Sequence, residues 1–249
     1  MSDPDLIVVL GATSAIAQAY ARRRAAGGAR FVLLARREDR LAVVAADLLA
    51  RGAASAEPVV MDLSALDEIE RAVETLHARF GPPREIVVAY GVLGEQGELE
   101  RDLAGARASL EVNFTSAALW LLAFLKRRDS TQPLTSLVIG SVAGDRGRAS
   151  NFIYGAAKGA LDVFVQGLAH AYAGTPARFV LVKPGFVDTP MTVGFAKAGP
   201  LWSSPERIAA DIERAVRRGR RVVYAPRFWR PIMAVIRALP WFVFRRLKI

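Results

Sequence analysis

Short apolar runs alternate with amphipathic stretches along most of the chain. The runs are Leu6–Leu10, Phe31–Ala35, Pro58–Met61, Glu85–Tyr90, Leu137–Ser141, Phe179–Val182 and Val222–Tyr224. Helical patterns begin at Ala15 and Ser204-Pro205 and cover Leu41–Leu49, Leu66–Phe80, Leu99–Lys126 and Tyr154 to about Ala173. Short, almost wholly apolar runs are typical of strands buried on both faces. Their alternation with helices predicts an α/β fold, a doubly wound sheet of about seven parallel strands with helices on both faces.

A turn of small residues follows the first strand. Leu6–Leu10 ends at Gly11-Ala12-Thr13-Ser14, and the helix begins at Ala15. In a Rossmann-type sheet, a strand, a tight turn and a helix N-terminus together bind a pyrophosphate through backbone amides. Gly11, Ala15 and Ala17 occupy the glycine positions of a G-x-x-x-G-x-G turn, so two glycines are replaced by alanine. An ordinary β–α turn could show the same pattern.

Two arginines, Arg36 and Arg37, follow the second strand. At this place an acidic residue would bond the ribose hydroxyls of NAD, whereas an arginine favours the 2′-phosphate of NADP. We therefore expect NADPH to be favoured, with NADH as the other candidate. The alternative interpretation is a solvated helix start without a ligand.

A serine, a tyrosine and a lysine with useful chemistry follow the fifth strand. Ser141 ends that strand, and Tyr154 and Lys158 lie four residues apart on one face of the next helix. A phenol with a pKa of about 10 is a poor proton donor at neutral pH unless a cation lowers that pKa. We expect Lys158 to be that cation. The alternative is a surface tyrosine with a helix-stabilising lysine.

Asn113 lies inside the apolar helical stretch Leu99–Lys126. A buried amide is costly unless its hydrogen bonds are made. It therefore either bonds a neighbouring strand or serves the reaction.

With these features the chain resembles the short-chain dehydrogenase/reductase family over essentially its whole length. The resemblance rests on the small-residue turn, Asp62, Ala89-Tyr90-Gly91, Asn113, the spacing of Ser141, Tyr154 and Lys158, and Pro184-Gly185 with Thr189. The chain departs from the family at the two turn alanines and in having Ala-Tyr-Gly where many members have Asn-Ala-Gly. These departures concern the pose of the cofactor and not the catalytic residues.

The resemblance implies hydride transfer between a nicotinamide and a carbonyl carbon. Tyr154 would supply the proton, and Ser141 would hold the carbonyl oxygen. Lys158 would lower the pKa of Tyr154 and bind the nicotinamide ribose, and Asn113 would position a water that restores the proton. The cofactor site would comprise Gly11, Thr13, Ser14, Ala15, Ile16, Arg36, Arg37, Asp62, Leu63, Ala89, Tyr90, Gly91, Tyr154, Lys158, Pro184, Gly185, Val187 and Thr189. We also expect a homo-oligomer.

Several short stretches are similar to reductases that convert a polyprenyl-phosphate-linked 2-keto-pentose to its arabinose form with a flavin-dependent oxidase partner. These stretches are Gly11–Ser14, Tyr90–Gly94, Gly140–Gly144, Ser150–Tyr154 and Val243–Ile249. The alternative enzyme is a reductase of a small or acyl-chain ketone. A non-catalytic NAD(P)-binding sensor or scaffold is the alternative of another class, but such a protein has no need of all four catalytic residues.

The 249 residues fit one domain, which we divide into a dinucleotide-binding part, residues 1–226, and a tail, residues 227–249. Within the first part, residues 186–203 are expected to form a mobile substrate lid. With no cysteine and two isolated histidines, His77 and His170, we expect no metal site. The N-terminus lacks the basic and apolar segments of a signal peptide, so we expect a cytoplasmic protein.

The net charge of +10 originates at the C-terminal end. From Arg214 to Ile249 there are eleven basic residues and no acidic one, and the remaining chain is nearly neutral. Pro231 and Pro240 can each begin a short helix, and the uncharged run Ala238–Phe244 is too short to cross a bilayer. Mixed aromatic and basic residues suit the inner face of a membrane. The alternative is docking on the domain or on a second subunit. No base-reading motif indicates nucleic acid.

Overall fold

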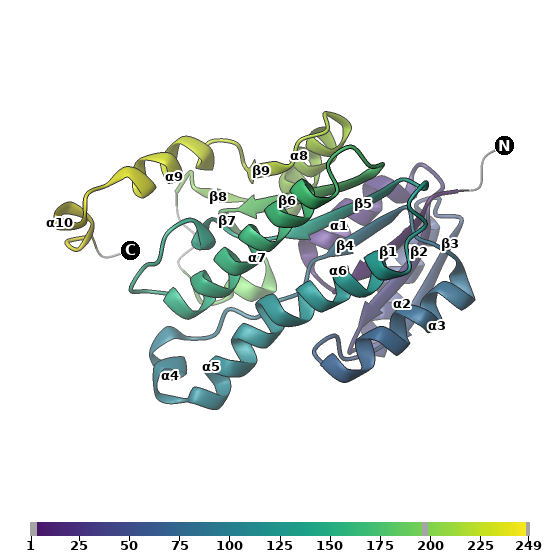
Figure 1. Ribbon diagram of the computed structural model, residues 1–249, viewed down its shortest axis with the longest axis horizontal. Helices are drawn as coiled ribbons and strands as arrows, with labels where there is room; N and C mark the ends of the chain where they lie inside the picture. The colour runs from purple at the N-terminus through teal and green to yellow at the C-terminus, as the bar shows by residue number, and fades with distance from the viewer. Residues whose placement is uncertain (1–3, 196–198, 248–249) are drawn as a thin grey trace.

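The computed structural model describes residues 4–195 and 199–247 as a three-layer α/β domain (Figure 1). The central sheet has seven parallel strands in the order β3-β2-β1-β4-β5-β6-β9. They are β1 (Leu6–Leu10), β2 (Arg30–Ala35), β3 (Ser55–Val60), β4 (Glu85–Val88), β5 (Leu134–Ile139), β6 (Ala177–Pro184) and β9 (Val222–Ala225). The doubly wound sheet expected from the alternating apolar runs is confirmed.

Helices cover both faces of the sheet. One face carries α1 (Ala15–Ala25), α2 (Glu38–Ala50) and α8 (Pro205–Arg217), and the other carries α3 (Ile69–Phe80), α6 (Ser116–Lys126) and α7 (Phe152–Ala171). Successive residues of a strand point to opposite faces, so Ile7 packs in the first layer and Val8 in the second. Both sets are buried, which explains why the strands read as continuous apolar runs and not as alternating ones.

The order of the strands reverses between β1 and β4, and a crevice forms at the carboxyl ends of the strands on either side of such a point. Gly11 leaves β1 there with φ of 87°, and a Cβ at this position would lie 2.8 Å from the backbone nitrogen of Tyr90. Glycine is therefore required at Gly11. The methyl group of Ala15 is accommodated beside the crevice, and that of Ala17 is buried between α1 and the sheet.

The stretch Leu99–Lys126, expected to be one helix, is divided, and this prediction was wrong in its boundaries. It contains the end of α4 (Gln96–Arg101), then α5 (Leu103–Leu110), a π-helical turn (Glu111–Thr115) and α6. Asp102 is extended and its carboxylate accepts a hydrogen bond from the backbone nitrogen of Ala104 at 3.1 Å, so it caps α5 and separates α4 from it.

The helix from Leu103 to Lys126 is long and apolar enough to cross a membrane by length and composition. Half of the most apolar 18-residue stretch of this helix is nevertheless buried inside the protein, as in the core helix of a globular domain. Length and composition are therefore weak evidence for a membrane span here.

The predicted lid, residues 186–203, contains regular structure at both ends. β7 (Phe186–Val187) pairs with β8 (Trp202–Ser203), and the Phe186 ring stacks on Trp202 with centroids 5.3 Å apart. Ser204 then caps α8, as its position before Pro205 predicted. Positions 196–198 of the predicted lid, 1–3 of the N-terminal segment and 248–249 of the tail lie outside the described residues.

The tail forms two short helices, α9 (Trp229–Ala238) and α10 (Trp241–Phe244), which extend beyond one end of the sheet in Figure 1. α10 begins directly after Pro240 as predicted, whereas α9 begins two residues before Pro231. Proline is tolerated there because the first turn of a helix needs no amide donor. Trp229 and Met233 are buried against Val142, so the inner side of the tail docks on the domain.

Candidate active site

A cavity of about 1050 Å³ lies at the carboxyl ends of the strands and extends from the end of β2 to α9. Every residue predicted for the cofactor site lines it except Arg37, and so do Ser141, Tyr154 and Lys158. The fold therefore brings together segments that are far apart in the sequence, from the turn after β1 to the segment after β6. Arg37 and Asn113 are not among the described residues that line it.

Ser141 lies two residues after the end of β5, and Tyr154 and Lys158 come from α7. A 3₁₀ turn (Val142–Asp145) follows Ser141, whose hydroxyl oxygen accepts from the backbone nitrogen of Ala143 at 3.0 Å. The Tyr154 hydroxyl is hydrogen-bonded to Ser141. Lys158 is buried; its Nζ lies 5.7 Å from the centre of the Tyr154 ring and donates to the carbonyl of Ile139 at 3.3 Å. The three groups thus form one cluster at the cavity wall.

The acidity of Tyr154 differs from the prediction. Burial raises its pKa to about 12, against the opposing effects of the Ser141 hydrogen bond and the positive charge of Arg148. The Lys158 ammonium group donates to the Ile139 carbonyl, and the cation whose charge lowers the pKa of Tyr154 here is Arg148. The effect of Lys158 on Tyr154 stays a prediction, and Arg148 is a cation that the sequence did not indicate. Tyr154 is therefore a protonated donor at neutral pH.

The buried charge of Lys158 should lower the free energy of unfolding at neutral pH. Burial lowers its pKa from 10.5 to about 8, so below pH 8 the folded protein holds a charge that the unfolded chain exposes to water. Lys158→Met should raise the stability at pH 7 by on the order of 2–3 kcal/mol. Between pH 8 and 10.5 the folded state loses this proton before the unfolded state does, so the advantage of the variant should disappear.

Chemical unfolding of both proteins from pH 6 to 11 measures this difference. Lys126→Met is the matched control, because Lys126 is exposed and pairs with Glu70 at the surface. A Lys158→Met variant that is less stable than the wild type at pH 7 would contradict the expectation.

The Asn113 side chain is buried in the π-helical turn and fully bonded. Its Oδ1 accepts from the backbone nitrogen of Val92 at 3.2 Å, and its Nδ2 donates to the carbonyls of Val92 at 2.8 Å and Ser109 at 2.9 Å. The amide thus holds the segment after β4 in place. This is the structural one of the two roles considered for Asn113. Its role in positioning a water stays a prediction.

The arginines after β2 separate into two groups. Arg36 lines the cavity, whereas Arg37 is exposed and pairs with Asp39 at 2.7 Å, so a solvated helix start describes Arg37. Arg40 also lines the cavity and was missed. Its position one helical turn after Arg36 and Arg37 could have identified it.

Tyr90 belongs to the Ala-Tyr-Gly segment that departs from the family pattern after β4, and its side chain has a structural role. Its hydroxyl forms a 2.6 Å hydrogen bond with Ser116 of α6, and Ser116 donates to the carbonyl of Leu63. The side chain is therefore tied to the helix layer, while the residue still lines the cavity. Nearby, Asp62 is held by Ser64, whose backbone nitrogen and hydroxyl donate to Oδ1 at 3.0 and 2.7 Å; these bonds lower the pKa of Asp62.

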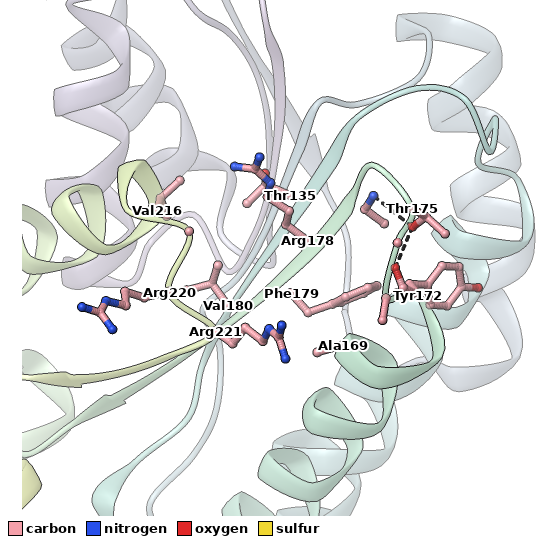
Figure 2. Close-up of a pocket in the computed structure, with 14 residues that line it drawn as sticks. Thr135, Ala169, Tyr172, Thr175, Arg178, Phe179, Val180, Val216, Arg220 and Arg221 are labelled. Carbon is pink, nitrogen blue, oxygen red and sulfur yellow. Dashed lines mark hydrogen bonds between the residues drawn. The ribbon is translucent and has the colours of Figure 1, made fainter.

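A second cavity, of about 280 Å³, lies near the amino ends of β5 and β6, at the opposite edge of the sheet. Its lining includes Arg178, Arg220 and Arg221, but in Figure 2 these side chains point in three different directions. Tyr172 and Thr175 are bonded within their own turn. This arrangement offers no convergent set of groups for catalysis.

The sequence and fold have clear relatives. Residues 5–198 match the family described as short chain dehydrogenase. The chain belongs to the short chain dehydrogenase family. It is 42% identical over 242 residues to an uncharacterized oxidoreductase of Mycobacterium tuberculosis H37Rv, a match that covers 97% of this chain and 96% of that protein. The short chain dehydrogenase assignment makes this chain an oxidoreductase.

Solved structures of other short chain dehydrogenases share the fold. One from Burkholderia cenocepacia J2315 in complex with NADP has a TM-score of 0.81 at 20% identity and covers 99% of this chain and 98% of its own. One from Burkholderia phymatum in complex with NAD has a TM-score of 0.79 at 22% identity, covering 89% of each chain. At these identities the likeness concerns the fold.

Proposed function

We propose that this chain is an NAD(P)H-dependent carbonyl reductase. The cavity suits a dinucleotide, because the helix start after Gly11, the carboxylate of Asp62 and the arginines Arg36 and Arg40 line one continuous surface that ends at Ser141 and Tyr154. A bound nicotinamide supplies the hydride that reduces a carbonyl carbon. That NADP or NAD is bound in the related structures supports the same assignment.

The residues of the chain would handle the proton and the oxygen. As the carbonyl carbon is reduced, its oxygen gains negative charge, and the Ser141 hydroxyl would donate a hydrogen bond to it. Tyr154, protonated at neutral pH, would give its proton to that oxygen and complete the alcohol. Arg148 and Lys158 are the cations closest to this step, and their charge would stabilise the phenolate that remains. Solvent protons would then restore Tyr154.

Arg36 and Arg40 should make the enzyme prefer NADPH. Each guanidinium can form a charge-assisted bond to the 2′-phosphate, and NADH lacks that group. The variant with both arginines replaced by alanine should lose about 10–100-fold in the kcat/KM for NADPH and change little for NADH. Steady-state kinetics with both cofactors test this, with Arg37→Ala as the control. An unchanged ratio would show that the 2′-phosphate does not bind there.

For the substrate we propose a keto-sugar linked to polyprenyl phosphate, such as decaprenylphospho-β-D-erythro-pentofuranosid-2-ulose, reduced to the arabinose form. A flavin-dependent oxidase would supply the ketone. This proposal rests on the apolar side chains that line the cavity at its substrate end. Ile232 and Ile236 of α9 and Phe195 and Leu201 of the lid line it, so an apolar chain could leave the cavity between them.

The outer side of these segments suits a membrane surface. Trp241 and Phe242 of α10 are 68% and 61% exposed, and Val193 of the lid is 73% exposed. Arg230, Arg237, Arg245 and Arg246 are exposed on the same tail. Aromatic residues enter the headgroup region, and each cation adds on the order of 1 kcal/mol near anionic lipid. We propose that the protein acts at the inner face of the membrane with this side toward the lipid.

The test is oxidation of NADPH by the purified protein in the presence of the 2-keto lipid sugar and anionic liposomes. Turnover that falls when Trp241 and Phe242 are both replaced by serine, with unchanged turnover of a short-chain soluble analogue, is the expected result. No turnover of the lipid sugar, together with efficient reduction of small or acyl-chain ketones, would replace this substrate by the soluble alternative. No turnover of any ketone would contradict the reductase itself.

A further inference from the structure

Three buried polar atoms, each on a residue that lines the catalytic cavity, have no hydrogen-bond partner within the described part of the chain. They are Nε of Arg148, Oδ1 of Asn151 and Nε1 of Trp229, and all three residues line that cavity. Buried polar groups in native proteins are nearly always bonded, so a cluster of unpaired ones in a cavity indicates a ligand that completes them. Two of these atoms are donors and one is an acceptor.

The three residues are fixed on two adjoining segments. Arg148 and Asn151 share the turn before α7, where the backbone nitrogen of Asn151 donates to the carbonyl of Arg148 at 3.2 Å. The Trp229 indole packs closely against Gly185, where a Cβ would lie 1.9 Å from Nε1. Arg146 joins the two segments, since it donates to the carbonyls of Ile236 in α9 at 2.5 Å and of Leu239 just after α9 at 2.8 Å.

The charge of Arg148 is not matched by a contact. The carboxylate that interacts with it, Asp145, is already bonded to Lys183 at 2.5 Å and to the Tyr224 hydroxyl at 2.7 Å. No described residue forms a hydrogen bond or ion pair with the guanidinium, although Arg148 is half-buried. A guanidinium in this state is suited to a ligand oxyanion, which it can bind with two parallel donors.

We propose that Arg148, with Asn151 and Trp229, forms a subsite for an oxyanion of the substrate, such as a phosphate ester on the carbon next to the ketone. This inference deepens the proposed reductase function and rests on it for the identity of the ketone. Arg148 and Tyr154 line the same cavity, so an anion bound to Arg148 would share that cavity with the reacting carbonyl. Asn151 would accept from a neighbouring hydroxyl, and Trp229 would donate to the anion or to that hydroxyl.

A matched pair of small ketones tests the subsite by binding, without any need for turnover. Dihydroxyacetone phosphate carries its phosphate on the carbon next to the ketone, and dihydroxyacetone is the same ketone without it. Both are titrated calorimetrically into the full-length protein saturated with NADP⁺, so that the 2′-phosphate site is filled. We expect the phosphate to increase affinity at least about tenfold, and Arg148→Ala to weaken binding of the phosphate ester by about 30-fold.

Three further variants separate binding from misfolding. Arg148→Lys keeps the charge but loses the second donor and should recover part of the affinity. Trp229→Phe removes the indole N–H and should cause a smaller loss. Arg217→Ala, at an exposed position of α8, is the control and should change nothing. Equal binding of the two ketones by the wild type, or unchanged binding of the phosphate ester by Arg148→Ala, would overturn the proposal.

Competition identifies the source of the oxyanion. Displacement of dihydroxyacetone phosphate by farnesyl phosphate in neutral liposomes at lower concentrations than by inorganic phosphate would assign the subsite to a lipid-linked ester. The reverse order would assign it to a soluble phosphate. Phosphate-dependent binding that requires Arg148, in a protein that reduces no ketone with NADPH, would refute the reductase function while leaving the subsite intact.

Discussion

Tyr154→Phe is expected to reduce the rate of carbonyl reduction by about 10²–10⁴-fold, the contribution of a positioned proton donor. The variant keeps the aromatic ring at the cavity wall and loses the hydroxyl that is bonded to Ser141. Because the pKa of Tyr154 is about 12, the wild type holds this proton throughout the neutral range. Single-turnover reduction measured from pH 6 to 8 should therefore show a loss that is nearly independent of pH.

Cofactor binding serves as the internal control for this variant. Most of the cavity that would hold the dinucleotide lies away from the hydroxyl, so the dissociation constant for NADPH should change less than threefold or so. Ser141→Ala should also lose turnover, by a smaller factor, since one donor to the oxygen is removed while the acid remains. A Tyr154→Phe protein that reduces ketones at the wild-type rate would show that another group supplies the proton.

The sheet could be predicted from the sequence because its strands are buried on both faces. Residues such as Ile7 and Val8 face opposite helix layers, and each layer requires an apolar side chain. The break at Asp102 was missed, because the apolar pattern of Leu99–Lys126 continues across it. A single capping carboxylate decides that boundary, and its effect depends on local backbone geometry, which periodicity does not record.

The catalytic cluster could be located because its spacing is set by one strand and one helix. Ser141 lies two residues after β5, and Tyr154 and Lys158 share a face of α7. Their electrostatics could not be predicted, because the direction of the Lys158 ammonium and the burial of Tyr154 depend on side chains from several elements. Arg148 lies in an irregular turn between them, so no period or motif identified it.

The orientation of the tail could not be predicted from the sequence either. Its composition indicated an aromatic and basic surface, yet composition does not say which side packs inward. In the structure Trp229 and Met233 are buried while Trp241 and Phe242 remain exposed. Arg146 holds this orientation, because it donates to the carbonyls of Ile236 and Leu239 and its guanidinium lies 3.7 Å from the centre of the Phe244 ring. Docking on the domain therefore describes the inner side of the tail, and membrane contact of its outer side stays a proposal.

A buried charge network supports the turn that carries Ser141. Lys183 of β6 lies 2.5 Å from one carboxylate oxygen each of Asp145 and Asp162, and Tyr224 of β9 donates to Asp145 at 2.7 Å. Burial alone lowers the pKa of Lys183, but its bonds to the two carboxylates raise that pKa overall. The lysine is therefore charged at neutral pH, and it joins β6, α7 and the 3₁₀ turn after Ser141.

Lys183→Met should consequently lower the free energy of unfolding by about 3–5 kcal/mol, because two buried carboxylates lose the cation between them. In a domain of this size that corresponds to a fall in Tm of roughly 10 °C. Thermal unfolding of the variant beside Lys126→Met, whose surface pair with Glu70 should contribute less than about 1 kcal/mol, measures the difference. Equal melting temperatures for the two variants would show that Asp145 and Asp162 are stabilised without Lys183. With the network lost, the turn after Ser141 should also become less ordered, so turnover should fall even below the melting transition.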